Sequence, residues 1–347
     1  MRYVGQRLVQ LVGVLLVVTF LTFLLVRFLP GDPVLSVTGC PETATQDPIC
    51  ADKIAQATED LGLDESIPVA YVHWLGDLLP PDIDLGFSYV RNTEVSELMA
   101  TAIPRTATLM VYSIIVSLVI AVPLGVLAAY RQSTWTDRFV STGAFGTLAI
   151  PNFVMGVILI YIFAINLGWF PASGVVPGPL DRVFESVFGW ALGTEAPPAS
   201  DASLIDHFKS YTLPVLALAL PQAAVFTRLL RTDMVATLSE DYIGMAKAKG
   251  MPVRRILLRH ALRPSSFTLL TVVGINIGQL IGGSVIIEFI WNINGMGSQL
   301  ATAVARSDYI VVQAGVVIVA TVFVIANFAV DFLYGVLDPR VRHARAH

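Results

Sequence analysis

The residues most suited to chemistry form one polar stretch, Ser239–Gly250, between two strongly apolar segments. Glu240 and Asp241 lie near its start, and lysines follow them. Acidic side chains stabilise the positive end of a helix, and glycine is common just after the last helical turn. We therefore expect a short helix that ends at Gly250. Two alanines near its end would keep this helix slim enough to dock into a groove, so the chemistry expected here is binding.

The segment after this helix is basic and amphipathic. Its apolar side chains are Ile256, Leu257, Leu258 and Leu262, and its cationic ones are Arg254, Arg255, Arg259 and Arg263. A helix of this composition can lie on anionic lipid headgroups. Lipid binding accounts for the arginines but not for the acidic start and the glycine stop of the preceding helix. We therefore favour a surface for a protein partner.

The sequence lacks the short motifs of common catalytic and nucleotide-binding sites. It contains no G-x-x-x-x-G-K-[ST] phosphate loop, no H-E-x-x-H zinc helix and no G-x-S-x-G nucleophile turn. The glycine-rich segment Asn294–Gly297 has no lysine, and we expect a turn there. The five histidines are scattered along the chain. We expect no enzyme activity, no directly bound cofactor or metal and no nucleic-acid partner.

The elements that must position this stretch are membrane helices. The chain has 347 residues, of which 55% are hydrophobic and 14% charged, and its mean hydropathy is +0.70. A helix of about 20 apolar residues crosses a bilayer core, and its backbone groups are satisfied within the segment. Six segments without acidic or basic residues have roughly this length: Leu8–Val26, Thr106–Tyr130, Phe145–Leu167, Ser210–Thr227, Pro264–Ile287 and Tyr309–Val330. We expect an all-α membrane protein with six transmembrane helices.

The distribution of basic residues predicts the orientation of these spans, because short cytoplasmic loops collect lysine and arginine. With the N-terminus inside, the inner segments hold most of the arginines, including the cluster from Arg228 to Arg263. The loop 30–103 has only Lys53 and Arg91 against many acidic residues. We therefore expect both termini in the cytoplasm, and the net charge of −4 conceals this asymmetry.

This topology divides the chain into an N-terminal transmembrane helix (1–29), an extracytoplasmic loop or cap (30–103), a core of five transmembrane helices (104–337) and a cytoplasmic tail (338–347). The polar stretch belongs to a cytoplasmic loop of the core at about 237–263. The loop 30–103 is too long for a simple connector, and its amphipathic stretches Ile54–Leu61 and Val69–Leu79 predict a small folded cap. In the second outer loop, Val183–Leu192 is expected either to lie on the membrane surface or to pack on the cap.

The two cysteines of the chain, Cys40 and Cys50, both lie in the first outer loop. An extracytoplasmic compartment permits disulfides, so we expect a bridge, which would stabilise this loop by about 2–3 kcal/mol. Two unpaired thiols are the alternative. A metal site has little support, because no histidine lies near either cysteine.

The fifth span combines small and polar residues. Gly274, Gly278 and Gly282 recur every four residues, a spacing that lets helices pack closely in lipid. Polar side chains in or just after this span are Asn276, Gln279, Ser284 and Glu288. Two interpretations remain open: this helix lines a polar transport pathway, or its amides bond to other helices without touching a substrate.

The pattern E-D-Y-x-x-x-A-x-A-K-G followed by R-R-x-L-L-R-H-A-L-R resembles the cytoplasmic EAA loop of bacterial ABC importer permeases, in the branch for dipeptides, oligopeptides and nickel. Three further segments are similar to that branch: L-V-R-F-L-P-G-D-P after the first span, G-W-F-P-A-S-G from Gly168 and V-D-F-L-Y-G-V-L-D-P-R from Val330. Together they cover nearly the whole chain. The sequence departs from the general EAA pattern at Gly244, where Glu is usual, and at Arg263, where Pro is usual.

This resemblance implies a type I ABC importer permease in the cytoplasmic (inner) membrane. It implies a second, homologous permease subunit in a heterodimer, two ATPase subunits that use ATP and Mg, and an extracytoplasmic substrate-binding protein. The EAA helix would dock in a cleft of an ATPase, and the fifth span would flank the translocation path. The residues expected to couple to the ATPase are Glu240, Asp241, Tyr242, Ala246, Ala248 and Gly250.

The resemblance favours di- or oligopeptides as substrates, with a nickel chelate or glutathione as the alternative. A secondary transporter driven by an ion gradient would favour repeated halves or charged groups at the membrane midplane, and the sequence offers neither. A membrane scaffold that binds cytoplasmic proteins without transport is the other rival hypothesis.

Overall fold

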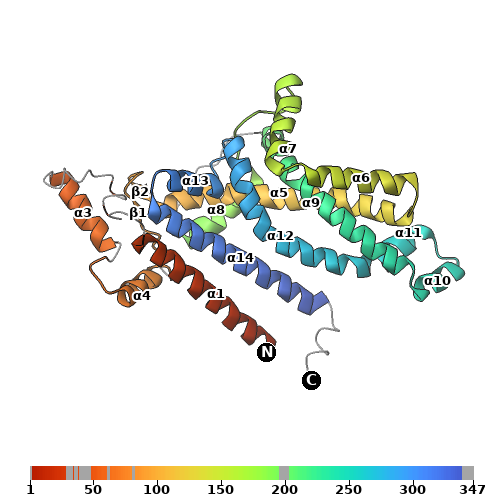
Figure 1. Ribbon diagram of the computed structural model, residues 1–347, viewed down its shortest axis with the longest axis horizontal. Helices are drawn as coiled ribbons and strands as arrows, with labels where there is room; N and C mark the ends of the chain where they lie inside the picture. The colour runs from red at the N-terminus through yellow and green to blue at the C-terminus, as the bar shows by residue number, and fades with distance from the viewer. Residues whose placement is uncertain are drawn as a thin grey trace. The chain divides into compact units, whose positions relative to one another are not determined.

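The computed structural model describes residues 2–28, 34, 38, 48–60, 63–79, 83–194 and 203–337. Most of these residues are helical, so the all-α class is confirmed (Figure 1). The chain divides into two compact units, each described by itself. Unit 1 comprises 1–107, 177–201 and 294–329, and unit 2 comprises 108–176, 202–293 and 330–347.

Unit 1 combines helices from both ends of the chain with a short hairpin. Its strands pair antiparallel, with Phe87 opposite Glu94. Helices α5 and α14 begin in this unit and continue into the residues of unit 2. The elements are α1 (Arg2–Arg27), α3 (Pro48–Asp60), α4 (Ile67–Asp77), β1 (Phe87–Ser88), β2 (Thr93–Glu94), the start of α5 (Val95–Tyr130), α8 (Pro179–Ala191), α13 (Met296–Ala305) and most of α14 (Tyr309–Leu337).

The core of unit 1 joins the hairpin region to α5, α13 and α14. Val95 and Met99 of α5 are fully buried, as is Val311 of α14. Beside this core, the Ser88 hydroxyl donates to the fully buried carboxylate of Asp308 at 2.6 Å. Burial of apolar side chains far apart in the sequence therefore holds the hairpin against the last helix.

Unit 2 is organised around one long helix, α9 (Leu204–Leu238), which packs against α6, α7 and α12. Apolar side chains of α9 such as Leu213, Phe226 and Leu230 are almost completely buried. The other elements are α6 (Trp135–Ala149), α7 (Asn152–Leu159), the π-helical segment η2 (Ile160–Asn166), α10 (Asp241–Ala248), α11 (Val253–Arg255), the π-helical segment η3 (Ile256–Ala261) and α12 (Leu262–Ile290).

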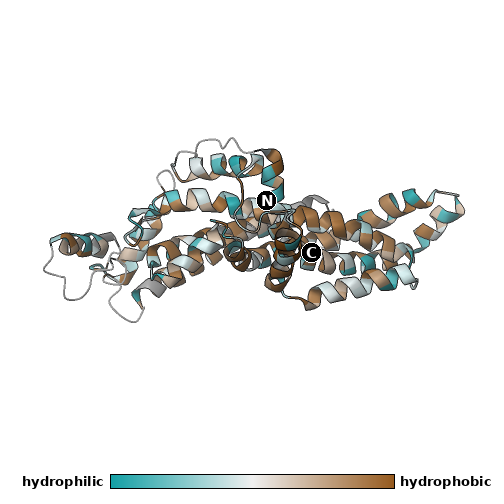
Figure 2. Cartoon of the chain, turned by 90° about the horizontal axis from the view of Figure 1, so that it is seen from above, coloured by the Kyte–Doolittle hydropathy of each residue, from teal (hydrophilic) through white to brown (hydrophobic). Residues whose placement is uncertain are grey.

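Among the described residues, four helical stretches are long and apolar enough to cross a membrane: Val95–Tyr130, Leu204–Leu238, Val253–Ile290 and Tyr309–Phe328. A bent pair of helices, α6 with α7 and η2, gives a fifth candidate, and Val9–Leu24 of α1 is a shorter apolar helix. Many apolar side chains on these helices are exposed, such as Val9 on α1 and Val119 on α5. Figure 2 shows that much of the helical ribbon belongs to hydrophobic residues, as expected of helices long enough to cross a membrane.

The third predicted span, Phe145–Leu167, is not one straight helix. Helix α6 ends at Ala149, and α7 begins at Asn152 after a bend of 100°. Pro151 lies at this break, where its ring fixes the backbone and it has no N–H to continue the α6 ladder. The prolines Pro123, Pro214 and Pro221 lie within continuous helices instead.

Two expectations for loops are also refined. Asn294–Gly297 is not only a turn, because helix α13 begins at Met296 with Gly295 directly before it. In the segment Val183–Leu192, Phe188 and Leu192 pack against the core of unit 1, whereas Trp190 stays 86% exposed. The side of α8 that carries Phe188 thus packs on the protein rather than facing outward.

Candidate functional site

The polar stretch forms helix α10, whose two ends follow from the residues found there. Glu240 has an extended backbone and precedes the first helical residue, and its carbonyl accepts the N–H groups of Ile243 at 3.0 Å and Gly244 at 3.3 Å. Asp241 lies in the first turn, where the helix dipole favours a negative charge. Gly250 has a φ of +71°, the left-handed conformation that ends many helices and that glycine adopts most easily.

One side of α10 is anchored to the rest of unit 2. Ile243 is fully buried and Ala246 is 5% exposed, and both pack with Ile256 of η3. The Tyr242 hydroxyl donates to the His260 carbonyl at 3.4 Å. Partial burial, and next the nearby Glu240 carboxylate, raise the pKa of Tyr242, so its phenol stays protonated at neutral pH.

The opposite side of α10, apart from the Tyr242 hydroxyl, makes no contact with the apolar clusters that the structure describes. Of the six residues expected to meet a partner, five are exposed: Glu240, Asp241, Tyr242, Ala248 and Gly250. Ala246 faces inward, so a direct role for it in docking has no geometric support. Met245 is 61% exposed and adds an apolar side chain to this surface. We call Asp241, Tyr242, Met245 and Ala248 the α10 face.

The basic segment continues this surface beyond α10. Ile256 and Ala261 of η3 are buried, whereas Leu258 is 49% exposed. The guanidinium-bearing residues Arg254, Arg255, Arg259 and Arg263 are all exposed. The segment is thus amphipathic, with its apolar residues divided between the core and the surface.

Helix α9, which leads into α10, is braced on both sides near its end. The Arg231 guanidinium donates from Nε to Asp137 Oδ1 at 2.5 Å and from Nη2 to Asp137 Oδ2 at 2.7 Å. Thr237 and Ser265 join α9 to α12 through their hydroxyls at 3.0 Å. Sequence reasoning missed both contacts, since no local signal links residues so far apart along the chain.

The polar residues of the fifth predicted span lie on different sides of α12. Asn276 is 7% exposed and donates to the Val272 carbonyl of its own helix at 2.8 Å. Glu288 is fully buried. Gln279 is exposed, on the same side as Gly282 and Ile275. The structure therefore does not gather these amides and the carboxylate on a single face.

The glycines of α12 also differ from one another in their surroundings. A Cβ at Gly282 would meet no atom within 4 Å. At the neighbouring Gly283, a Cβ would lie 3.1 Å from Asn152 Nδ2 of α7. Gly274 is buried and Gly278 is half-buried. A close approach of α12 to α7 occurs at Gly283, and the described residues leave the surface around Gln279 and Gly282 open.

The predicted disulfide falls partly outside the described residues. Cys50 lies in α3 and is disulfide-bonded. Cys40 lies outside the described residues, so its pairing stays a prediction. The described residues contain no group of three or more His, Cys, Asp or Glu arranged to hold a metal ion.

Comparison with known proteins covers nearly the whole chain. The model of the family described as "Binding-protein-dependent transport system inner membrane component" matches residues 121–343, and the model of its N-terminal part matches residues 1–110. A probable peptide ABC transporter permease of Sinorhizobium fredii is 34% identical over 341 residues, 98% of this chain and 99% of that protein. An oligopeptide transport system permease of Bacillus subtilis is 35% identical over 347 residues, with 98% and 99% covered. A glutathione transport system permease of Salmonella typhimurium is 33% identical over 343 residues, with 99% of each covered.

Proposed function

Because this chain belongs to the family of binding-protein-dependent transport system inner membrane components, we propose that it is the membrane-spanning subunit of an ATP-driven peptide importer. The observation that carries this function is the likeness over the full chain to permeases named for peptide and oligopeptide transport. The substrates would be di- or oligopeptides. The chain would not hydrolyse ATP, and two separate ATPase subunits would use ATP and Mg.

The α10 face would be the contact with an ATPase subunit. It presents an aromatic ring, a flexible thioether and a small alanine beside an acidic first turn, while the inner side of the same helix is fixed by Ile243 and Ala246. A helix with one anchored side and one free apolar side fits recognition in a groove. Movement of the ATPase subunits would then reach the membrane helices through α9, which is continuous up to Leu238.

The rest of the assembly follows from the same family membership. We propose six transmembrane helices, with the bent α6–α7 pair and α1 completing the set, both termini in the cytoplasm and residues 30–103 outside. A homologous permease would cover the open surface of α12 near Gln279 and Gly282, where no described residue comes within 4 Å of a Cβ at Gly282. An extracytoplasmic binding protein would deliver the substrate.

Substitutions on the α10 face test the coupling. Met245→Glu places a charge at the centre of the exposed side, and burying an unpaired charge in an interface is costly. We expect co-purification of the ATPase subunits to fall about tenfold or more, because 1.4 kcal/mol corresponds to a factor of ten. Met245→Leu is the matched control and should retain the ATPases. Normal recovery of the ATPases with Met245→Glu would contradict docking at this face.

Uptake into proteoliposomes tests the transport function itself. The complete complex, with its binding protein, should import a labelled tripeptide only in the presence of ATP. Uptake that persists without the ATPase subunits would overturn the ABC mechanism in favour of an ion-coupled transporter. Because one relative is named for glutathione transport, glutathione is the second substrate to measure. A preference for glutathione, or for a nickel chelate, over simple peptides would replace the peptide assignment.

A further inference from the structure

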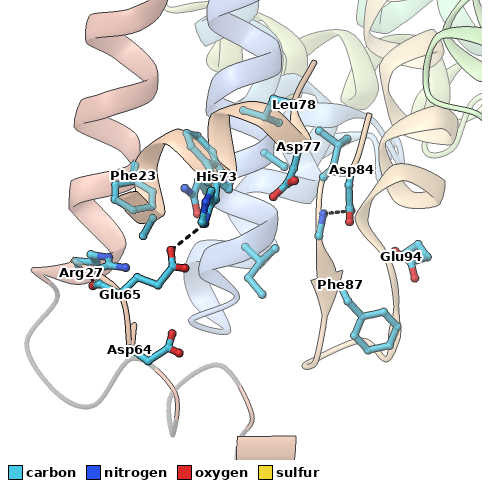
Figure 3. Close-up of a pocket in the computed structure, with 17 residues that line it drawn as sticks. Phe23, Arg27, Asp64, Glu65, His73, Asp77, Leu78, Asp84, Phe87 and Glu94 are labelled. Carbon is cyan, nitrogen blue, oxygen red and sulfur yellow. Dashed lines mark hydrogen bonds and ion pairs between the residues drawn. The ribbon is translucent and has the colours of Figure 1, made fainter. Parts of the chain in front are cut away.

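A cavity of about 610 Å³ lies within unit 1. Its walls come from α1, α4, the loop before the hairpin, the hairpin itself and α14. Figure 3 shows Phe23 of α1 beside His73 of α4, with Asp77 and Asp84 further along the same wall. Small-molecule sites in proteins have volumes of roughly 300–1,000 Å³, so this cavity is large enough for a ligand.

The lining of this cavity is strongly acidic. Its carboxylates outnumber its basic groups, which are Arg27 and His73. The carboxylates are Asp64, Glu65, Asp77, Asp84 and Glu94. An excess of carboxylates in one concave surface focuses a negative potential there and favours a cation.

Three of these five carboxylates, Glu65, Asp84 and Glu94, are already engaged, and two are not. Glu65 accepts from His73 Nδ1 or pairs with it at 3.0 Å, and Asp84 Oδ1 accepts the Gly86 N–H at 2.7 Å. The carboxylates of Asp64 and Asp77 make no hydrogen bond or ion pair with any residue that the structure describes. Their charges are therefore available to a ligand.

A buried amide in the same wall gives an independent indication of a polar ligand. Gln313 of α14 is only 6% exposed and lines the cavity. Its side-chain amide makes no hydrogen bond to another described residue. Its amide atoms are not fully enclosed by the protein, so they are open to the cavity and able to bond to a molecule there. A ligand with hydrogen-bonding groups would satisfy this amide.

The aromatic residues decide which kind of cation fits. Phe23 and Trp74 both line the cavity, with ring centroids 5.6 Å apart, and the Arg27 guanidinium already lies 5.1 Å from the Phe23 ring centroid. Aromatic faces attract ammonium and guanidinium groups. The described carboxylates do not converge in a group of three or more that could hold a metal ion. An organic cation therefore fits this wall better than a bare metal ion does.

We propose that this cavity binds a small organic cation, a molecule that carries an ammonium or guanidinium group beside hydrogen-bonding amides. Asp64 and Asp77 would neutralise the cation, Trp74 would pack against it, and Gln313 would bond to an amide of the ligand. Ligand binding in this cavity can be measured without transport. The proposal for this site and the proposed importer function can therefore be refuted independently of each other.

Titration calorimetry tests this site on the complete permease complex in lipid nanodiscs. The probe is arginyl-arginine amide, and the neutral counterpart is the N-acetylated peptide with citrulline in place of both arginines. We expect saturable binding of the cationic peptide, at least about tenfold tighter than that of the neutral one, a factor that corresponds to 1.4 kcal/mol. Equal affinities, or no cationic-peptide binding up to about 10 mM, would overturn the proposal.

Two charge-matched double variants locate the binding. Asp64→Asn with Asp77→Asn should weaken binding of arginyl-arginine amide by about tenfold or more. The control, Asp52→Asn with Glu97→Gln, removes the same charge from exposed positions of unit 1 that do not line the cavity, and should leave the affinity unchanged. Equal weakening by both pairs would show a general charge effect and contradict this site. Gln313→Leu keeps the side-chain size and should weaken binding of arginyl-arginine amide severalfold. A thermal midpoint equal to that of the unaltered protein shows that this variant retains the fold.

Discussion

Arg231 of α9 and Asp137 of α6 form a two-pronged ion pair, with N–O distances of 2.5 and 2.7 Å. The Asp137 side chain is 6% exposed and that of Arg231 28%, so the pair is partly shielded from water. The same carboxylate also accepts the Ser133 N–H at 2.8 Å. Asp137 therefore joins the turn before α6 and helix α6 itself to the end of α9 that leads into α10.

Asp137→Asn should destabilise unit 2, because it leaves the Arg231 charge without its partner. Hydrogen bonds to charged groups contribute about 1.5–3 kcal/mol, and we expect a loss near the lower end since Arg231 retains access to water. Asp137→Asn with Arg231→Gln removes both charges and should recover part of this loss. A double-mutant cycle on thermal unfolding measures the coupling. A coupling near zero would mean that the pair does not brace α9.

Several features of the fold could be predicted from the sequence because they depend on local patterns. Long apolar segments predicted four continuous helices that are long and apolar enough to cross a membrane. The acidic start and Gly250 predicted the bounds of α10. The inner side of α10 could not be predicted. Ile243 and Ala246 have the same spacing as Tyr242 and Met245, so either pair could face inward until the position of η3 is known.

Other features depended on distant contacts and left no local signal. Five prolines lie in predicted spans, counting Pro264 at the start of the fifth, but only Pro151 marks a break between described helices. Neighbouring groups can satisfy the backbone carbonyls that a proline frees, so the helix can continue. The fifth span shows the same limit. Its glycine spacing predicted a packing face along Gly274, Gly278 and Gly282, which stays a prediction. The close approach of Asn152 to the neighbouring Gly283 left no signal in that spacing.

Gly250→Ala should destabilise the end of α10 through backbone strain alone. A Cβ at this position would meet no atom within 4 Å, but the φ of +71° costs a non-glycine residue about 1–2 kcal/mol. Gly244→Ala is the matched control in the same helix. It also has open space around it, and alanine is more favourable than glycine in a helix by about 1 kcal/mol. The two substitutions should therefore change hydrogen-exchange protection of α10 in opposite directions, and a change of the same sign would refute this account.

Gly156→Ala should disturb packing between α7 and the end of α12. Its Cβ would lie 2.9 Å from Trp291 Cζ3, and the Trp291 ring is fully buried and has little room to move. Overpacking of this kind costs about 1–3 kcal/mol, so we expect a lower thermal midpoint.

Two further variants separate this clash from a general effect of alanine. Gly146→Ala on α6 has no atom within 4 Å of the added Cβ and should be neutral or slightly stabilising. Trp291→Phe should relieve the clash, so the double variant Gly156→Ala with Trp291→Phe should be more stable than the sum of the single changes predicts. Strict additivity would show that Trp291 is not the residue that excludes a side chain at Gly156.

Glu185 of α8 should make the stability of unit 1 depend on pH. Burial, and next the Asp181 charge, raise the pKa of Glu185 above its usual value of 4.5, although Arg105 and Arg182 oppose the shift. The folded state therefore holds this proton more tightly than the unfolded state does. The protonated Glu185 carboxyl therefore contributes to the free energy of unfolding in full below the unfolded-state pKa, and this contribution is lost as the pH rises through the folded-state pKa.

Glu185→Gln, which mimics the protonated form, should be more stable than the unaltered protein at about pH 7.5 and lose this advantage toward about pH 4.5. Thermal midpoints of both proteins across this range measure the difference, and a difference that is constant with pH would mean that Glu185 does not titrate with a raised pKa.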